Sequence, residues 1–366
     1  MIISTVAMVP VRGLRCHYRA IILGVALITL LCCFWIVSRY PQLWSKSQHL
    51  GNDLATMAYS KEVLPIVASM PWWQKIVYGA VNWLDSMKIG MSFGVASGAL
   101  LHTILKYYPL KIGNNLYLNT LKGALIGAPM GVCANCAVPM ACGVTRGHGR
   151  VEVALGFLFS SPNFNPIVVM MTIAALPAPM VVAKYSVLLI VILGVVPGLI
   201  TWLERDKPLK LLTVLDSAGS CALPLRHDCR EPFQSVFCEL VLEFVRNVWM
   251  LLKPTIAIML LASVVSASLL EFVPWDQLLS NPTPGRLFVA SFLSTFMPVP
   301  IGLDVMFAAV LLKKGVAAGF VMLFAMTLGT YSIVPSIFLW REVSKKLAVL
   351  LFLFFMLVGW GLGLCF

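Results

Sequence analysis

The chain has 366 residues, of which 60% are hydrophobic and only 11% are charged, and its mean hydropathy is +0.90. A soluble domain carries roughly 25% charged residues because its surface faces water, so this composition excludes a soluble protein. The net charge of +12 does not indicate nucleic-acid binding, because the lysines and arginines gather in loops and at the ends of apolar stretches, where positive charge sets membrane orientation.

Apolar stretches long enough to cross a membrane recur along the chain, since a spanning helix needs about 20 such residues. Seven are continuous and two are interrupted by glycine and proline. The continuous ones are Ala20–Ser38, Ile89–Leu105, Val151–Leu176, Val181–Leu203, Ala257–Leu270, Phe320–Trp340 and Leu347–Leu364, and the interrupted ones are Leu116–Val144 and Leu287–Leu312. Helices satisfy their own backbone groups in lipid, so the sequence predicts an all-α, polytopic membrane helix bundle.

The first stretch follows three arginines, Arg12, Arg15 and Arg19, which predict a cytoplasmic N-terminus in an inner membrane. Its apolar core is longer than that of a signal peptide, and no small-residue cleavage pattern follows it. We therefore expect residues 1–41 to form an N-terminal segment with a retained first helix. Tyr40–Trp73 is predicted to be an external connection.

The interrupted stretch Leu116–Val144 contains helix breakers at Gly127, Pro129 and Pro139. It is either a single broken span or a re-entrant hairpin that enters and leaves on one side. The hairpin is favoured, because it keeps the basic segment Glu204–Arg246, which carries six lysines and arginines, in the cytoplasm.

A second interrupted segment has the same layout. Thr145–Arg146–Gly147 and Lys313–Lys314–Gly315 lie 168 positions apart, and that offset places Cys136 on Asp304. Three spans between the two units would invert the second, as in secondary transporters built from paired broken helices. Residues 74–203 and 247–366 are thus predicted to be two inverted repeats, joined by the loop 204–246. One observation opposes this: inversion puts Lys313 and Lys314 outside.

Cys133 and Cys136 are the first candidate site residues, because residues three apart share a helix face and two soft thiolates suit a soft metal such as Cu(I). The alternative is that they are small residues that permit close helix packing. Cys142 would join them only if the helix broke at Pro139.

Polar residues beside the breaks complete the candidate set, since polar groups at membrane depth are costly and often functional. Asn135 lies between the two cysteines, and Asn163 and Asn165 lie between Pro162 and Pro166. These amides could instead satisfy the interrupted backbone. Asp304 follows Pro298 and Pro300, and it is either a proton or cation carrier or the cap of a short helix beginning near Val305.

The run from Gly127 through Cys133, Cys136 and Pro139, followed by Ser161–Pro162–Asn163–Phe164–Asn165–Pro166, resembles the arsenical-permease (ArsP-like) family of predicted permeases. The resemblance is close from Gly123 to Pro166 and looser from Phe296 to Ser332. It implies efflux, with trivalent organoarsenicals as the best-known substrates. Family members resemble Cys-x-Cys here, whereas Asn135 occupies the second cysteine's place, which weakens the arsenical assignment.

These features predict a permease that exports a small thiophilic or metal-containing solute by alternating access, with ion coupling. It would need no cofactor and would not be an enzyme; its partners would be lipid and solute, with a second copy or another subunit also admitted. Two alternatives stay open. The chain could be a membrane-embedded redox protein that uses Cys133 and Cys136 as a dithiol, or a channel-like subunit of a larger complex.

Overall fold

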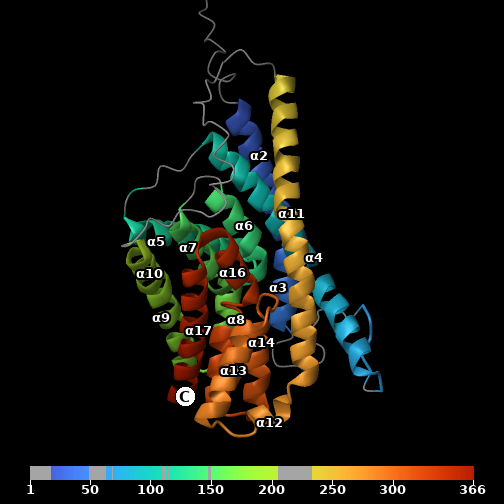
Figure 1. Cartoon of the computed structure of the whole chain (residues 1–366), viewed down its shortest axis with the longest axis vertical. Coiled ribbons are helices and arrows are strands. Elements are labelled where there is room, and N and C mark those ends of the chain that lie inside the picture. Colours follow the sequence, from blue (N-terminus) through green and yellow to red (C-terminus); the bar gives the residue numbers. More distant parts are fainter. Residues whose placement is uncertain are drawn as a thin grey trace, which may run out of the picture.

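The computed structural model describes residues 18–48, 63–67, 69–108, 113, 115–146, 150–204 and 233–366, and every regular element in these ranges is a helix. The helices pack into an elongated bundle with the C-terminus at the end opposite the start of α2 (Figure 1). Within the described ranges, five helices are long and apolar enough to cross a membrane, and a bent pair makes six if it is one span. The expected all-α membrane bundle is confirmed at this level.

The N-terminal helix is longer than predicted. α2 (Tyr18–Cys33) continues through a π-helical turn, η1 (Phe34–Arg39), into α3 (Tyr40–Gln48). The helix therefore continues past the expected end of the first span at Ser38 and into the expected connection Tyr40–Trp73. The wider π-helical backbone directly before Pro41 accommodates a residue that lacks a backbone donor.

Two long helices form the spine of the bundle. α4 (Trp72–Tyr107) has 36 residues and α11 (Phe233–Phe272) has 40, and they lie side by side in Figure 1. A 40-residue helix is about 60 Å long, twice the hydrocarbon thickness, so α11 extends well beyond the membrane. Residues 233–246, predicted to be loop, belong to this helix, while residues 205–232 lie outside the described residues.

The first interrupted segment consists of α5 (Leu116–Gly127), a short turn η3 (Ala128–Met130) and α6 (Ala134–Arg146). It is followed by α7 (Val151–Asn163) and α8 (Pro166–Ala175), which are bent by 46° at the residues between them. A Cβ at Gly123 would lie 2.1 Å from the carbonyl oxygen of Val153 in α7, so the backbones of α5 and α7 are in close contact. The predicted span Val151–Leu176 is thus a broken pair.

The second interrupted segment repeats this order with α13 (Pro284–Phe296), α14 (Leu303–Lys313), α15 (Ala318–Thr327) and α16 (Ile333–Phe338). The short α12 (Trp275–Leu279) precedes it, η5 (Leu339–Val343) extends α16, and α17 (Lys345–Cys365) ends the chain. Between the two segments, α9 (Ala178–Ile190), η4 (Val191–Val195) and α10 (Val196–Glu204) form one span. The predicted span Phe320–Trp340 is interrupted between α15 and α16.

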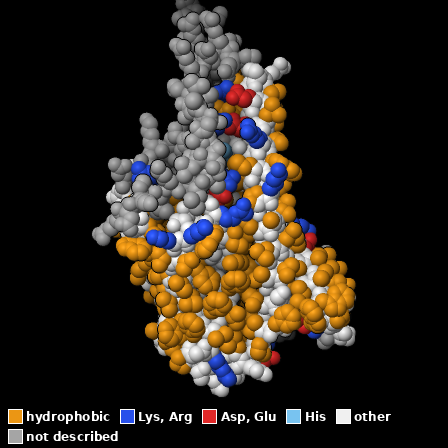
Figure 2. Space-filling view, in the orientation of Figure 1, with side chains coloured by type: hydrophobic (Ala, Val, Ile, Leu, Met, Phe, Trp, Pro, Cys, Tyr) orange, Lys and Arg blue, Asp and Glu red, His pale blue; other side chains and the backbone are white. Residues whose placement is uncertain are grey.

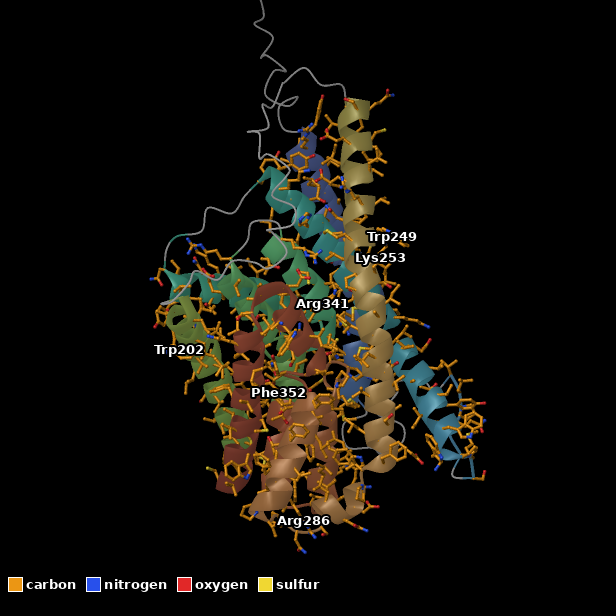
Figure 3. The ribbon with its side chains drawn as sticks, in the orientation of Figure 1. Trp202, Trp249, Lys253, Arg286, Arg341 and Phe352 are labelled. Atoms are coloured by element: carbon orange, nitrogen blue, oxygen red, sulfur yellow. The ribbon has the colours of Figure 1, made fainter. Side chains whose placement is uncertain are left out.

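The kind of side chain on the surface changes along the long axis of the molecule. A broad hydrophobic band covers the lower part of the view in Figure 2, and charged side chains gather above it. Figure 3 shows Trp249 and Lys253 of α11 above Arg286 of α13, which lies at the opposite end. Arg19 pairs with Glu239 and Lys106 with Glu243 at the charged end. We name this the basic end, and the end that carries α12 the opposite end.

Candidate functional site

The two cysteines lie at the start of α6, where the chain leaves the break of the first segment. We call residues 131–136 the first tip. Gly131 has a φ of +61°, a conformation that favours glycine and turns the chain before α6 begins. The Sγ atoms of Cys133 and Cys136 are 2.7 Å apart, and the Sδ of Met87 lies 3.9 Å from Cys133 Sγ. Both cysteines are buried, so the tip presents three soft sulfur atoms inside the protein.

A line of glycines on α4 allows α6 to lie this close. Gly90, Gly94 and Gly98 are spaced four apart on one face of α4. A Cβ at Gly94 would lie 2.3 Å from the carbonyl oxygen of Cys136, and one at Gly98 would lie 2.2 Å from that of Pro139. Small residues at four-residue spacing permit such backbone contact between membrane helices. This spacing was visible in the sequence and was not used.

Pro139 does not break the helix. α6 continues through it to Arg146, so the expected hinge at this position is wrong. The carbonyl group of Pro139 packs against Gly98 of α4. Because α6 does not break there, Cys142 stays a further turn and a half along the helix and does not join the two thiols.

Asp304 lies in the corresponding place of the second segment. We call residues 297–304 the second tip. Gly302 has a φ of +76° and is the N-cap of α14, so Asp304 is one residue inside the helix and makes no capping hydrogen bond. Its Oδ2 accepts a hydrogen bond from Lys184 Nζ at 2.7 Å, and Lys184 is completely buried. The backbone of Gly329 packs directly against this carboxylate.

The asparagines connect the breaks. Asn135 Nδ2 donates to the carbonyl oxygen of Val299 at 3.2 Å, and its Oδ1 accepts from Ser332 Oγ at 2.8 Å. Asn163 Oδ1 accepts from Thr330 Oγ1 at 3.2 Å. Both asparagines therefore join a break in the first segment to one in the second. Asn165 instead caps α8 through Ile167, and its Nδ2 lies beside Gly131 without a hydrogen-bond partner.

The remaining predicted break residues flank these contacts. Gly127 ends α5 and Pro129 lies in η3. Pro162 lies in the last turn of α7, and Pro166 is the first residue of α8. Pro298 and Pro300 lie in the extended segment between α13 and α14, where the carbonyl of Pro298 accepts a hydrogen bond from Trp83 Nε1. The break residues thus surround the place where the two tips meet.

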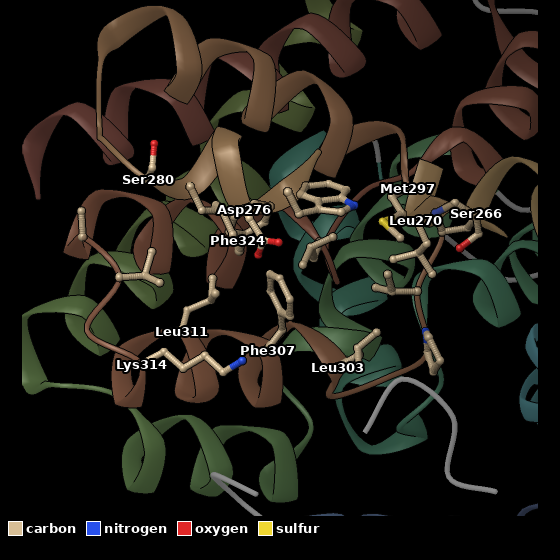
Figure 4. Close-up of a pocket in the computed structure, with 18 of the residues that line it drawn as sticks. Ser266, Leu270, Asp276, Ser280, Met297, Leu303, Phe307, Leu311, Lys314 and Phe324 are labelled. Carbon is tan, nitrogen blue, oxygen red and sulfur yellow. The ribbon is translucent and has the colours of Figure 1, made fainter. Parts of the chain in front are cut away.

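A cavity of about 540 Å³ leads from the opposite end toward this meeting point. Figure 4 shows Asp276, Ser280 and Lys314 around it together with apolar side chains such as Phe307 and Leu311. Its lining includes Pro298, Val299 and Pro300. Asn135 and Trp83 each donate a hydrogen bond to a carbonyl of this segment.

Two buried cations at the tips were missed by the sequence analysis. Lys184 was hidden inside a predicted apolar span, although a lone lysine there is a signal. Arg39 directly follows the predicted first span, which ends at Ser38. Its side chain lies near Cys136, since a Cβ at Gly90 would be 2.9 Å from Cys136 Sγ and 3.2 Å from Arg39 Nη2.

Comparison with known proteins agrees with a membrane carrier. The model of a family described as predicted permease (ArsP_1) matches residues 87–362. The UPF0718 protein YraQ of Escherichia coli (strain K12) is 27% identical over 113 residues, which cover 30% of this chain and 32% of that protein. The alignment thus spans about a third of this curated relative. No solved structure matches the chain.

Proposed function

Because this chain belongs to the ArsP_1 family of predicted permeases, we propose that it exports a small thiophilic solute, one that contains a metal or metalloid, by alternating access. The paired thiols of the first tip are the observation that carries this proposal. Thiolate and thioether sulfurs select soft cations, and three of them converge here from α4 and α6.

The solute site would lie where the breaks meet, which is where transporters of inverted repeats bind their substrates. Inversion is supported by the ends of the hairpins. The start of α5 bonds to the start of α7 through Asn119 and Glu152, and α6 ends at Arg146, which pairs with Glu342. α14 ends instead beside the cavity at the opposite end, where Lys314 lies.

Reciprocal packing gives a second argument for two related units. α6 of the first segment packs against α16 of the second, and α14 of the second packs against α8 of the first. Each re-entrant tip therefore contacts the other unit's broken helix. Such an arrangement lets one unit rock against the other about a fixed site. The basic end would face the cytoplasm, which makes the 540 Å³ cavity an outward vestibule.

The second tip supplies the proposed coupling. Lys184 and Asp304 form an ion pair inside the membrane-embedded part of the bundle, where a charge without a partner is costly. Protonation of Asp304 would release Lys184, and deprotonation would restore the pair. A proton taken up at Asp304 on one side and released on the other would drive solute export.

A resistance screen tests the proposal. A deletion strain carrying the wild-type gene would be compared with the empty strain across metals, metalloids and organoarsenicals. We expect Cys133→Ser to abolish the resistance at unchanged membrane abundance, because oxygen is a poor ligand for soft species. Cys142→Ser, on the same helix, is the matched control and should behave as wild type. Full resistance in Cys133→Ser and in Cys136→Ser would refute the ligand role.

The proximity of the two free thiols also favours a second function, that of a membrane dithiol redox protein. Oxidation of Cys133 and Cys136 to a disulfide would release two protons and two electrons to a membrane acceptor. Trapping of thiols with a maleimide in intact cells distinguishes the two functions. A carrier keeps the pair reduced while it confers resistance, whereas a redox protein cycles between the two states.

A further inference from the structure

Arg39 is a buried cation with an unusual setting. It is 5% exposed and lies at the end of the π-helical turn η1. Its guanidinium lies 4.8 Å from the ring centre of Phe34, which in turn stacks on Phe93 of α4. Residues on the other side of the turn, such as Val37, are largely exposed. The π turn thus directs Arg39 into the bundle, toward the first tip.

No carboxylate among the described residues pairs with Arg39. The ion pairs that arginines form there use Arg19, Arg146 and Arg150, and Arg39 Nε has no hydrogen-bond partner. Its Nη2 and the Sγ of Cys136 both lie beside Gly90, 3.2 Å and 2.9 Å from where a Cβ on that glycine would be. A buried cation without a counter-charge is strongly unfavourable. The thiols of the first tip are acidic groups that act electrostatically on Arg39.

Resting on the transport function proposed above, we propose that Arg39 is the counter-cation of the solute site and that it selects a soft metal ion of charge +1. Two cysteine thiols bind such an ion M⁺ by releasing two protons, which gives a bis-thiolate complex of charge −1. The positive charge of Arg39 balances that complex. The N-terminus of α6, at which both cysteines lie, favours the same negative charge.

A trivalent organoarsenical gives a different charge balance. R–As(OH)₂ reacts with two thiols to form R–As(S–Cys)₂ and two water molecules, and this product is neutral. Arg39 would then stay buried without a counter-charge, at the cost described above. The charge of the site therefore favours Cu(I) or Ag(I) over the organoarsenicals that the family resemblance implies.

The residue that confers this preference lies outside the matched part of the chain. The family match begins at residue 87, and Arg39 belongs to the N-terminal helix. The same helix reaches both tips: Trp35 lies against Gly131 and Leu43 against Gly302. The N-terminal helix is thus part of the solute site and not only a membrane anchor.

The apolar vestibule, in contrast, would suit an organic solute, so the two candidate classes are tested directly. The full chain is purified into lipid nanodiscs and titrated with Cu(I) against a chelator, and separately with phenylarsine oxide. We expect Arg39→Gln to weaken Cu(I) binding by about thirtyfold or more, because it removes one partner of a buried charge pair. Its affinity for phenylarsine oxide should not fall.

Three controls keep the result interpretable. Arg39→Lys keeps the charge and should bind Cu(I) more tightly than Arg39→Gln, or within about tenfold of wild type if the glutamine variant does not fold. Arg286→Gln, at the opposite end, should bind both probes normally. Equal losses for both probes, unchanged Cu(I) binding in Arg39→Gln, or loss of Cu(I) binding in Arg39→Lys would overturn the role of Arg39. Normal binding of both probes by Cys133→Ser would instead refute the transport site itself.

Discussion

The two tips have the same construction and different chemistry. Each follows a glycine with positive φ, each begins a short helix, and each places an acidic side chain near a cation from another helix. In the first tip the pair is Cys136 with Arg39, and in the second it is Asp304 with Lys184. A thiol binds soft metals, whereas a carboxylate gives up and takes up a proton more readily than a thiol does. Two tips with the same backbone structure can therefore serve solute binding in one unit and proton coupling in the other.

We expect the two tips to enter the bundle from opposite sides of the membrane. In a cysteine-free background, Gln277→Cys in α12 should react with an impermeant maleimide in intact cells, and Gln234→Cys at the start of α11 should react only after permeabilisation. Both side chains are exposed, so burial does not limit the reaction. The reverse pattern, or equal labelling of both, would contradict the proposed orientation.

Loss of one charge should lower the free energy of unfolding more at the second tip than at a partly exposed ion pair. Asp304→Ala leaves Lys184 buried without a partner and should lower the free energy of unfolding by about 3–5 kcal/mol. Replacing both, in Asp304→Leu with Lys184→Met, should cost less. The half-exposed pair of Lys75 and Glu271 is the control, since Glu271→Ala should cost under about 1 kcal/mol. Denaturant titration in detergent micelles measures all three, and equal costs would contradict the buried pair.

Glycines opposite the tips allow each tip to be disturbed by itself. A Cβ at Gly90 would lie 2.9 Å from Cys136 Sγ, and one at Gly329 would lie 2.8 Å from the carboxylate carbon of Asp304. Each Gly→Ala change should cost about 1–3 kcal/mol through overpacking. Gly90→Ala should weaken solute binding and leave proton coupling intact. Gly329→Ala should weaken proton coupling and leave solute binding intact. If both variants lose the same property, the tips do not have separate roles.

The sequence predicted the positions of the breaks well, because proline, glycine and polar residues are conspicuous in apolar surroundings. Asn135, Asn163 and Asp304 were chosen on that basis, and the two asparagines join a break of the first segment to a break of the second. Pro139 was the exception: proline usually interrupts a helix, but α6 continues through it to Arg146.

The cations could not be assigned in the same way. Lys184 lies 120 positions from its partner Asp304, and nothing in an apolar span tells which residue a lysine will face. A lone lysine also commonly extends along a helix toward the membrane surface. Arg39 lies just past the predicted end of the first span at Ser38, whereas the π-helical turn continues the helix and Arg39 is buried.

Transport in reconstituted vesicles under an imposed pH gradient tests the division between a binding tip and a coupling tip most directly. The Asp304→Asn, Lys184→Met double variant removes the titratable carboxylate without leaving a buried lysine unpaired. We expect it to exchange solute across the membrane when solute is present on both sides, and to show no uphill transport when the gradient is applied. Gradient-driven transport by this variant at the native rate would contradict the account.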